Sequence, residues 1–254
     1  MIEAYIKNRI KEKKILLMTH IVLGYPNFED SFKIVEAMVR AGVDLMELQI
    51  PFSEPIADGS VILRANQKSL AAGTTVQECL DFAEKVTSQF DIPFLFMSYY
   101  NILFKYNVER FADAMLSVGI KGTIVPDIPP EEGREYISAM KDRQLAPVFI
   151  FSPSTPEKRM KYIADAGSGF IYCVARKGVT GDSTDFSKTL DDYLLKCRSA
   201  TDLPLALGFG VKDKDDIDFL RGRVDIAVIG TQTIRLVENK GVDAVGDFIV
   251  GLRP

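Results

Sequence analysis

The sequence predicts a single (β/α)8 barrel of the TIM type with one extra helix at its amino end. Short apolar segments alternate with amphipathic helical patterns eight times along the 254 residues, and this length is typical of one such barrel. The segments are apolar on both faces, as the buried strands of a parallel sheet require. A doubly wound sheet would alternate in the same way, but eight regular units favour closure. No linker rich in proline, glycine or serine divides the chain, so we expect one domain over residues 1–254.

The first elements are predicted from apolar spacing. A helix is expected over residues 2–13, where one side carries Ile2, Tyr5, Ile6 and Ile10. A strand follows at 15–23 and ends at the turn sequence of residues 24–27. The next helix has apolar side chains at spacings of four, three and four, at Phe28, Phe32, Val35 and Val39,. It leads to the second strand at 45–50.

The alternation continues to the carboxyl end. One helix is expected to open at Pro130, another at Thr155-Pro156-Glu157, and the last covers about 243–252,. Two connections exceed the usual length, residues 51–75 and residues 176–184. Both leave the carboxyl ends of strands, the face where barrels hold their active sites. The six further strands are expected at 93–99, 122–127, 146–151, 170–175, 204–210 and 225–230.

The composition limits the kinds of partner. Net charge is −4 with both signs interspersed, so no basic stripe indicates nucleic acid. No long apolar run opens the chain or approaches a membrane span, so we expect neither a signal peptide nor a membrane. Three scattered cysteines, Cys79, Cys173 and Cys197, fit a reducing, cytoplasmic location,. His20 is the single histidine. A structural zinc site needs four ligands, and one histidine with three scattered cysteines does not supply them well, so no metal is expected.

Two carboxylates meet at the end of the second strand. If Met46 and Leu48 face the helices, Glu47 faces the inside of the barrel, where a charge is costly unless it has a role or a partner. Asp58 follows on the loop and is expected to be more exposed to solvent than Glu47. Two acids in unequal surroundings have separated pKa values, as acid/base sites require. The alternative is that a basic neighbour neutralises Glu47 and that Asp58 only forms a turn.

Other polar residues fall at the same face. Tyr99 ends the third strand, Asp127 ends the fourth and Tyr172 lies on the sixth. The tyrosines could equally be core residues with satisfied hydroxyls, and Asp127 could cap the helix after Pro129-Pro130. His20 lies on the first strand as either a pocket residue or a satisfied core histidine.

Glycines at the last strands indicate a phosphate site. Gly208-Phe209-Gly210 closes the seventh strand and Gly230-Thr231 closes the eighth, each just before a helix. Small residues and a helix amino terminus let amides reach an oxyanion, and this is the usual phosphate site of barrels. Gly178 and Gly181 lie in the loop after the sixth strand. Lys177 in that loop could form a Schiff base, but its glycine-containing surroundings favour a solvated lysine.

Residues 47–59, Glu-Leu-Gln-Ile-Pro-Phe-Ser-Glu-Pro-Ile-Ala-Asp-Gly, resemble the signature of the tryptophan synthase alpha chain family. The resemblance extends over essentially the whole chain. Supporting matches occur in the family's order at 23–26, 99–101, 126–129, 176–181, 208–210 and 229–231.

The resemblance implies a (β/α)8 lyase of tryptophan biosynthesis that cleaves indole-3-glycerol phosphate to indole and glyceraldehyde 3-phosphate. It implies that Glu47 moves protons between the glycerol hydroxyl and the indole ring. Asp58 would hold the indole N–H, and Tyr172 would support Glu47. A retro-aldol cleavage of this kind needs no metal or cofactor if carboxylates flank the ring.

The resemblance also implies the rest of the site and a partner. Amides around Gly181, Gly210, Gly230 and Thr231 would hold the phosphate. No cofactor is expected in this chain; pyridoxal phosphate is expected on a beta-chain partner in an α2β2 assembly, which receives indole through a tunnel. Residues of the indole pocket and its lid would be His20, Tyr99, Phe209, Arg176 and Thr180.

Three residues depart from the family's usual pattern. Gln49 stands in place of glycine, Glu54 in place of aspartate, and His20 in place of an aromatic or other apolar residue. Gln49 is expected to crowd the pocket or reorient Glu47. Two alternatives therefore remain: a weakened barrel that mainly activates the beta chain, or another phosphate-binding barrel, either an aldolase acting through Lys177 or an isomerase.

Overall fold

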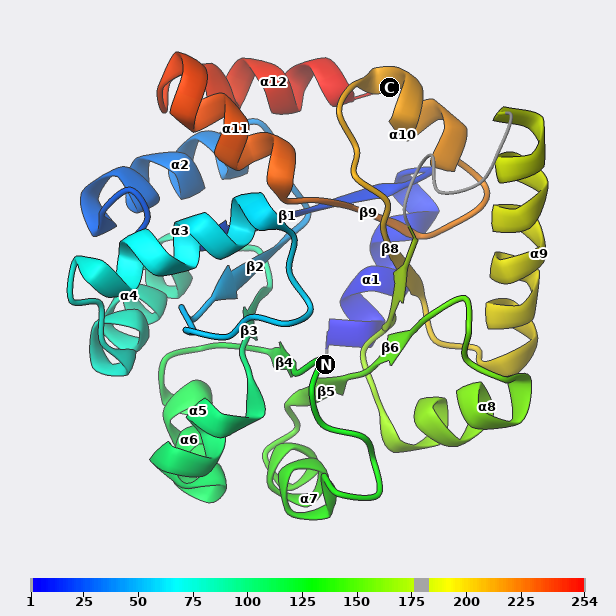
Figure 1. Cartoon of the computed structure of the whole chain (residues 1–254), viewed down its shortest axis with the longest axis horizontal. Helices are drawn as coiled ribbons and strands as arrows, with labels where there is room; N and C mark the ends of the chain where they lie inside the picture. Colours follow the sequence, from blue (N-terminus) through cyan, green and yellow to red (C-terminus); the bar gives the residue numbers. More distant parts are fainter. Residues whose placement is uncertain (1, 176–182, 254) are drawn as a thin grey trace.

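A parallel sheet forms the centre of the molecule and helices surround it (Figure 1). The computed structural model describes residues 2–175 and 183–253, except for the side chains of residues 183–187. Strands neighbour one another in the order β5-β4-β3-β2-β1-β9-β8-β7-β6. The strands are β1 (Leu16–Val22), β2 (Leu45–Gln49), β3 (Phe94–Met97), β4 (Gly122–Ile124), β5 (Ala146–Val148), β6 (Ile150–Phe151), β7 (Ile171–Val174), β8 (Leu205–Gly208) and β9 (Ile226–Ile229).

The two ends of the sheet meet within one predicted strand. β5 and β6 are the halves of the strand expected at 146–151, separated at Phe149. β5 pairs with β4, whereas β6 pairs with β7. The amide of Tyr172 also donates to the carbonyl oxygen of Phe149, at 3.0 Å. The sheet is therefore a nearly closed barrel with eight strand positions, which confirms the predicted fold class.

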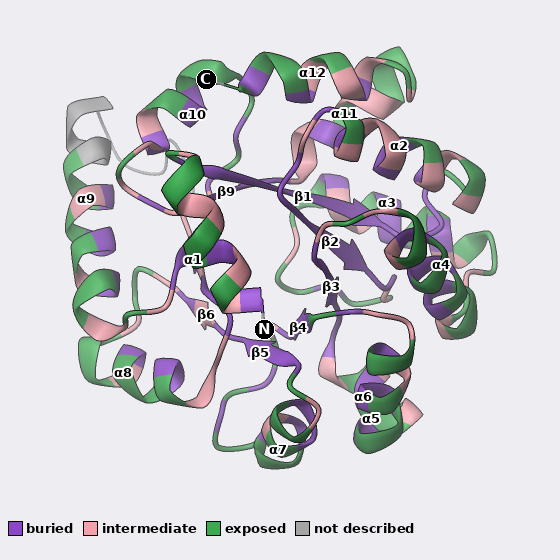
Figure 2. Ribbon diagram, turned by 180° about the vertical axis from the view of Figure 1, so that it is seen from behind, coloured by how far each residue is buried: buried purple, intermediate pink, exposed green. Residues whose placement is uncertain are grey.

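Helices form a ring outside the barrel, and α1 closes one end of it. Figure 2 shows α1 lying across that end, where Ile2 and Ile6 pack into the interior cluster. None of the helices described is long and apolar enough to cross a membrane. The helices are α1 (Ile2–Glu12), α2 (Phe28–Arg40), α3 (Ser60–Ala71), α4 (Val76–Gln89), α5 (Tyr100–Tyr106), α6 (Val108–Ser117), α7 (Arg134–Asp142), α8 (Glu157–Ala166), α9 (Ser183–Ala200), α10 (Lys214–Leu220), α11 (Thr231–Lys240) and α12 (Ala244–Leu252).

The connection predicted at 51–75 is not one long loop, because α3 occupies its centre. Val61 and Ala65 on α3 are buried in a cluster with Tyr25 and Ile234. This packing gives α3 a tertiary partner, which a short helix needs for stability. The loop after β2 is thereby shortened, and Asp58 lies just before the helix.

Some helix starts differ from those predicted. α7 begins at Arg134 rather than Pro130, because residues 129–133 form a turn. α8 begins after Pro156, while the Thr155 hydroxyl accepts from the amide of Ser152 at 3.1 Å. Asp127 accepts from the amide of Tyr100 at 2.9 Å and so caps the start of α5. These starts depend on loop turns that apolar spacing does not report.

Strand alternation decides which side chains face the inside. Met46 and Leu48 belong to the outer core between sheet and helices, as predicted. Leu45 belongs to the interior cluster, and Glu47 follows it in the same phase,. In the register of β1 and β2, His20 lies opposite Glu47. These two polar side chains are therefore neighbours on the inner wall.

Candidate active site

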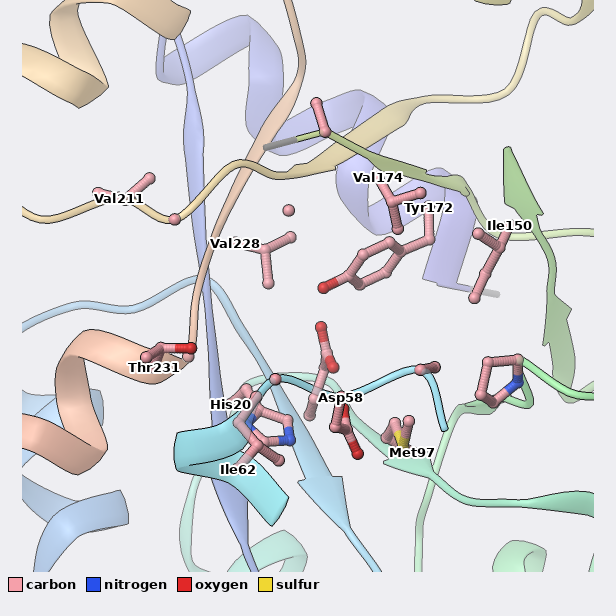
Figure 3. Close-up of a pocket in the computed structure, with 18 of the residues that line it drawn as sticks. His20, Asp58, Ile62, Met97, Ile150, Tyr172, Val174, Val211, Val228 and Thr231 are labelled. Atoms are coloured by element: carbon pink, nitrogen blue, oxygen red, sulfur yellow. The ribbon is translucent and has the colours of Figure 1, made fainter. Parts of the chain in front are cut away.

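A cavity of about 1120 Å³ opens at the carboxyl ends of the strands. It is lined by side chains from strands far apart in the sequence, and Figure 3 shows His20, Asp58, Tyr172 and Thr231 arranged around it. Seven of the predicted site residues line it: His20, Glu47, Asp58, Tyr172, Gly210, Gly230 and Thr231.

Glu47 is a buried acid with no cation beside it. Glu47 is 2% exposed, and its Oε1 has no hydrogen-bond partner within the part of the chain that the structure describes. Burial first, and the charge of Asp58 second, raise the pKa of Glu47 to about 8,. Among the residues that the structure describes, no lysine or arginine pairs with it, which argues against the alternative of a neutralised core acid. Near neutral pH the carboxyl group therefore carries its proton.

This raised pKa predicts a pH-dependent difference in stability between the wild type and Glu47→Gln. As pH rises from 4.5 to about 8, the unfolded chain releases the proton of Glu47 whereas the folded chain keeps it. The free energy of unfolding then falls by about 1.4 kcal/mol per pH unit from this group. The glutamine variant lacks this contribution. Urea unfolding should show the wild type losing about 2–3 kcal/mol relative to the variant between about pH 5.5 and pH 7.5. Parallel stability curves for the two proteins would contradict the raised pKa.

Asp58 is held at the cavity by two donors on the same oxygen. Gln49 Nε2 donates to Asp58 Oδ2 at 2.7 Å, and the Tyr99 hydroxyl donates to the same atom at 3.1 Å. The Tyr99 oxygen in turn accepts from the amide of Ala57 at 3.1 Å. Oδ1 has no partner within the described part of the chain. Asp58 therefore does more than form a turn: one oxygen is anchored and the other is available to a ligand.

His20 and Gln49 continue this set of hydrogen bonds. His20 Nε2 lies 2.7 Å from Gln49 Oε1, and both side chains are buried. His20 Nδ1 has no hydrogen-bond partner among the described residues. Burial lowers the pKa of His20, although Asp58 and Gln49 oppose this shift. Gln49 is not among the residues that line the cavity, and its amide bonds to His20 and Asp58. Its expected effect on the pocket and on Glu47 stays a prediction.

Tyr172 projects into the cavity from β7 (Figure 3). Burial first, and the charges of Glu47 and Asp58 next, raise the pKa of its hydroxyl well above the usual value, so it stays protonated,. Gly208 on β8 makes room for this ring. A Cβ there would lie 3.1 Å from Tyr172 Cε1 and 3.1 Å from its hydroxyl oxygen. The Tyr172 ring lies so close to the backbone here that a residue with a Cβ would crowd it, which explains the glycine at position 208.

The opposite end of the cavity suits an anion. Gly210 has a φ of +84°, which favours glycine,. Gly230 precedes α11 and Thr231 is its first residue, so the amino end of this helix faces the lining,. Lys212 and Arg235 also line the cavity, and no acidic partner of their side chains lies within residues 2–175 or 188–253. Sequence reasoning missed these two cations, because only the fold brings them beside the glycines.

Phe209, expected in the indole pocket, lies outside the cavity lining. Its ring stacks on Phe219 of α10 with centroids 5.7 Å apart, in the outer core. It follows Gly208 by one residue, and alternation turns it toward the helices. Tyr99 also lies outside the lining and contacts the site through Asp58. The remaining candidates, Gly181, Arg176 and Thr180, lie outside the described residues, as does Lys177.

A barrel that brings two carboxylates of unequal burial and an anion-binding end into one cavity defines a class of enzyme. Such an enzyme acts by acid/base chemistry on a small phosphorylated substrate. Within the same described residues, no group of three His, Cys, Asp or Glu side chains is placed to hold a metal ion.

Comparison with known proteins identifies the family. The family model of the tryptophan synthase alpha chain matches residues 6–247, and the chain belongs to this family. The chain is 61% identical over 253 residues to the alpha chain of Syntrophotalea carbinolica, covering 100% of both. It is 60% identical to that of Desulforapulum autotrophicum, covering 99% of this chain and 100% of the relative. This chain is thus a lyase of tryptophan biosynthesis that cleaves indole-3-glycerol phosphate.

Solved structures agree on the fold. Tryptophan synthase subunit alpha from Legionella pneumophila superposes with a TM-score of 0.91 at 26% identity, covering 99% of this chain and 96% of that chain. The chain is also similar to a chain of the tryptophan synthase complex from Pyrococcus furiosus. There the TM-score is 0.85 at 24% identity, with 93% of this chain and 97% of that chain covered. The second likeness bears on the fold alone.

Proposed function

We propose that Glu47 is the acid/base of the cleavage and that Asp58 stabilises the indole ring during it. The main support is the state of Glu47: it is buried, has no ion-pair partner among the described residues and lies on the cavity wall with Asp58. A carboxyl group with a pKa of about 8 keeps its proton near neutral pH and is also a strong enough base to take one up,. It therefore suits both halves of a proton transfer.

The proposed steps conserve protons and electrons. Glu47 delivers its proton to C3 of the indole ring, and the ring nitrogen becomes a cationic N–H that donates to Asp58 Oδ1. Glu47, now a carboxylate, takes the proton of the neighbouring glycerol hydroxyl. The electron pair of that O–H bond forms the aldehyde C=O, and the pair of the breaking C–C bond returns to the ring. Indole and glyceraldehyde 3-phosphate result, and Glu47 is protonated again.

Tyr172 is proposed to support Glu47 rather than to transfer a proton itself. Its hydroxyl stays protonated because its pKa lies well above the usual value. A neutral O–H in the cavity donates a hydrogen bond to the carboxylate that forms after the first proton transfer. The Gly208 position keeps space for this ring. Tyr172 therefore stabilises the charged intermediate state of Glu47.

The substrate phosphate is proposed to bind at the amides of Gly210, Gly230 and Thr231, with Gly181 as a further candidate. Thr231→Asp tests this end of the cavity. A carboxylate is favourable at the first residue of a helix, so the melting temperature should not fall. It would repel a bound phosphate, and the Kd of glyceraldehyde 3-phosphate, measured by calorimetry, should rise by about 100-fold. Thr231→Ala is the matched control, since it keeps the amide. Unchanged affinity in the aspartate variant would place the phosphate elsewhere.

The beta chain of tryptophan synthase is the proposed partner, in an α2β2 assembly that carries pyridoxal phosphate on the beta chain and passes indole to it. Membership of the tryptophan synthase alpha chain family supports this. Two large apolar side chains near the active face also support it: Ile56, two residues before Asp58, is 81% exposed, and Phe104 on α5 is 64% exposed. A biosynthetic enzyme of this kind is proposed to be cytoplasmic.

The rate of indole release from indole-3-glycerol phosphate, with and without a beta chain, tests the proposed function. We expect cleavage by the isolated chain and faster cleavage in the complex. Undetectable cleavage in both, with beta-chain activation retained, would favour the weakened activator instead. Covalent trapping of substrate on Lys177 by borohydride would favour the Schiff-base aldolase.

A further inference from the structure

Three polar side chains join β1, β2 and the loop after β2 into one line of hydrogen bonds. His20 Nε2 lies 2.7 Å from Gln49 Oε1, and Gln49 Nε2 lies 2.7 Å from Asp58 Oδ2. The proposed proton transfers use Asp58 but neither His20 nor Gln49, so the function of these two buried side chains needs an explanation of its own.

The chemistry of the groups fixes the direction of every donor in this line. A carboxylate only accepts, so the amide nitrogen of Gln49 must face Asp58. The amide oxygen of Gln49 must then face His20, and it accepts a hydrogen bond from the Nε2–H group. Burial lowers the pKa of His20, so the ring is neutral near pH 7 and carries its single N–H at Nε2. His20 Nδ1 is left as a bare acceptor.

We propose that Gln49 is a positioning residue that connects the Nε2–H tautomer of His20 to Asp58 and holds the free Asp58 oxygen toward the substrate. This rests on the proposed role of Asp58 in binding the indole N–H. Gln49 occupies Oδ2 together with Tyr99, which leaves Oδ1 for the ring. Gln49 touches neither the cavity nor a reacting atom and acts only through its neighbours.

A different role is conceivable for His20 and gives the opposite expectation. His20 Nδ1 would lie 3.4 Å from a Cβ placed on Gly230, near the phosphate end. A protonated imidazole there would be a cation for the phosphate. Burial opposes this role, because it lowers the pKa of His20 and so favours a neutral ring whose Nδ1 is an acceptor.

His20 is the single histidine of the chain, so one ¹⁵N-labelled imidazole reports directly on this line. We expect the NMR spectrum of the full chain at about pH 7 to show a neutral ring protonated at Nε2. In Gln49→Met the side chain keeps a similar length but loses both amide groups, and the spectrum should move to a mixture of tautomers. Gln77→Met is the matched control, because Gln77 bonds to Asp81 on the surface at 2.8 Å. A cationic ring, an Nδ1–H ring or an unchanged spectrum in Gln49→Met would overturn the proposal.

Kinetics of indole-3-glycerol phosphate cleavage test the consequence for Asp58. Gln49→Met should lower kcat by about 10- to 100-fold and change KM much less, because Asp58 matters most when the ring becomes cationic. His20→Phe should lower kcat less, and should add nothing in the Gln49→Met background. Circular dichroism and melting temperature exclude simple unfolding. Wild-type kcat in Gln49→Met, or additive effects of the two changes, would overturn the proposal.

The pH dependence of kcat in Gln49→Glu distinguishes the proposed positioning role from a merely structural one. Two carboxyl groups at hydrogen-bond distance share one proton, so the variant needs a proton that the wild type does not. Its kcat should therefore fall as pH rises in an additional limb, beside the limb that Glu47, with a pKa of about 8, gives the wild type as well. A pH profile with the wild-type limb alone would overturn the proposal. If Asp58→Asn kept normal cleavage, the proposed function of Asp58 would fail, whereas the tautomer result would still decide the hydrogen-bond line. The two failures are thus distinguishable.

Discussion

Glu47→Gln is expected to lower kcat for cleavage of indole-3-glycerol phosphate by about 1,000-fold, within the range for loss of an acid/base group. Glutamine has nearly the same shape, so the cavity and its phosphate end remain. It has no proton to deliver to the ring carbon and cannot take one from the glycerol hydroxyl. Both halves of the reaction are therefore lost together. The other carboxyl group in the described lining, Asp58, lies on the loop after β2 and does not occupy the same place.

Steady-state kinetics of the isolated chain measure this effect. The Kd for glyceraldehyde 3-phosphate should stay within about 3-fold of the wild type, because glutamine keeps the shape of the side chain and Glu47 makes none of the proposed phosphate contacts. Glu54→Gln is the matched control, since Glu54 is an exposed carboxylate on the neighbouring loop. Near-normal turnover in Glu47→Gln would assign the proton transfer to another group.

Asp58→Asn is expected to lower kcat by about 100- to 1,000-fold, as is typical when one charge-stabilising group is removed. Asparagine can still accept from Tyr99 and remains beside Gln49, so the loop keeps its place. What disappears is the negative charge that balances the cationic ring N–H. Because this charge matters mainly in the transition state, kcat should fall far more than KM rises.

The measurement is again steady-state cleavage by the isolated chain, with Asp91→Asn as control, since Asp91 is an exposed aspartate ahead of β3. An equal loss in kcat and in affinity for the product indole would indicate that Asp58 binds the ground state as strongly as the transition state. A normal kcat would remove Asp58 from the mechanism.

The pattern of the sequence predicted the barrel and the inward direction of Glu47. Strand alternation is local: once Met46 and Leu48 pack outward, Glu47 has no other direction available,. The same rule applied to Gly208-Phe209 would have turned Phe209 outward, yet the aromatic ring beside two glycines suggested a pocket wall. Alternation is the stronger constraint there, because Phe209 stacks on Phe219 in the outer core.

Other features could not be predicted from the sequence. The connection after β2 folds into α3 because Val61 and Ala65 find a buried cluster, and such a partner is visible only in three dimensions. Lys212 and Arg235 join the phosphate end because α11 starts beside the loop that follows β8. Neither residue carries a local signal that separates it from an ordinary surface cation.

The sequence by itself determined the fold class, the family and the two acids, because periodicity and a long signature are properties of neighbouring residues. Only the tertiary structure decided how the site is held together. Gln49, His20 and Asp58 come from a strand, its neighbouring strand and a loop, and their hydrogen bonds depend on the path of that loop to within a few tenths of an ångström,. Spacing along the chain indicates which face a side chain takes, whereas the fold decides which groups it meets there.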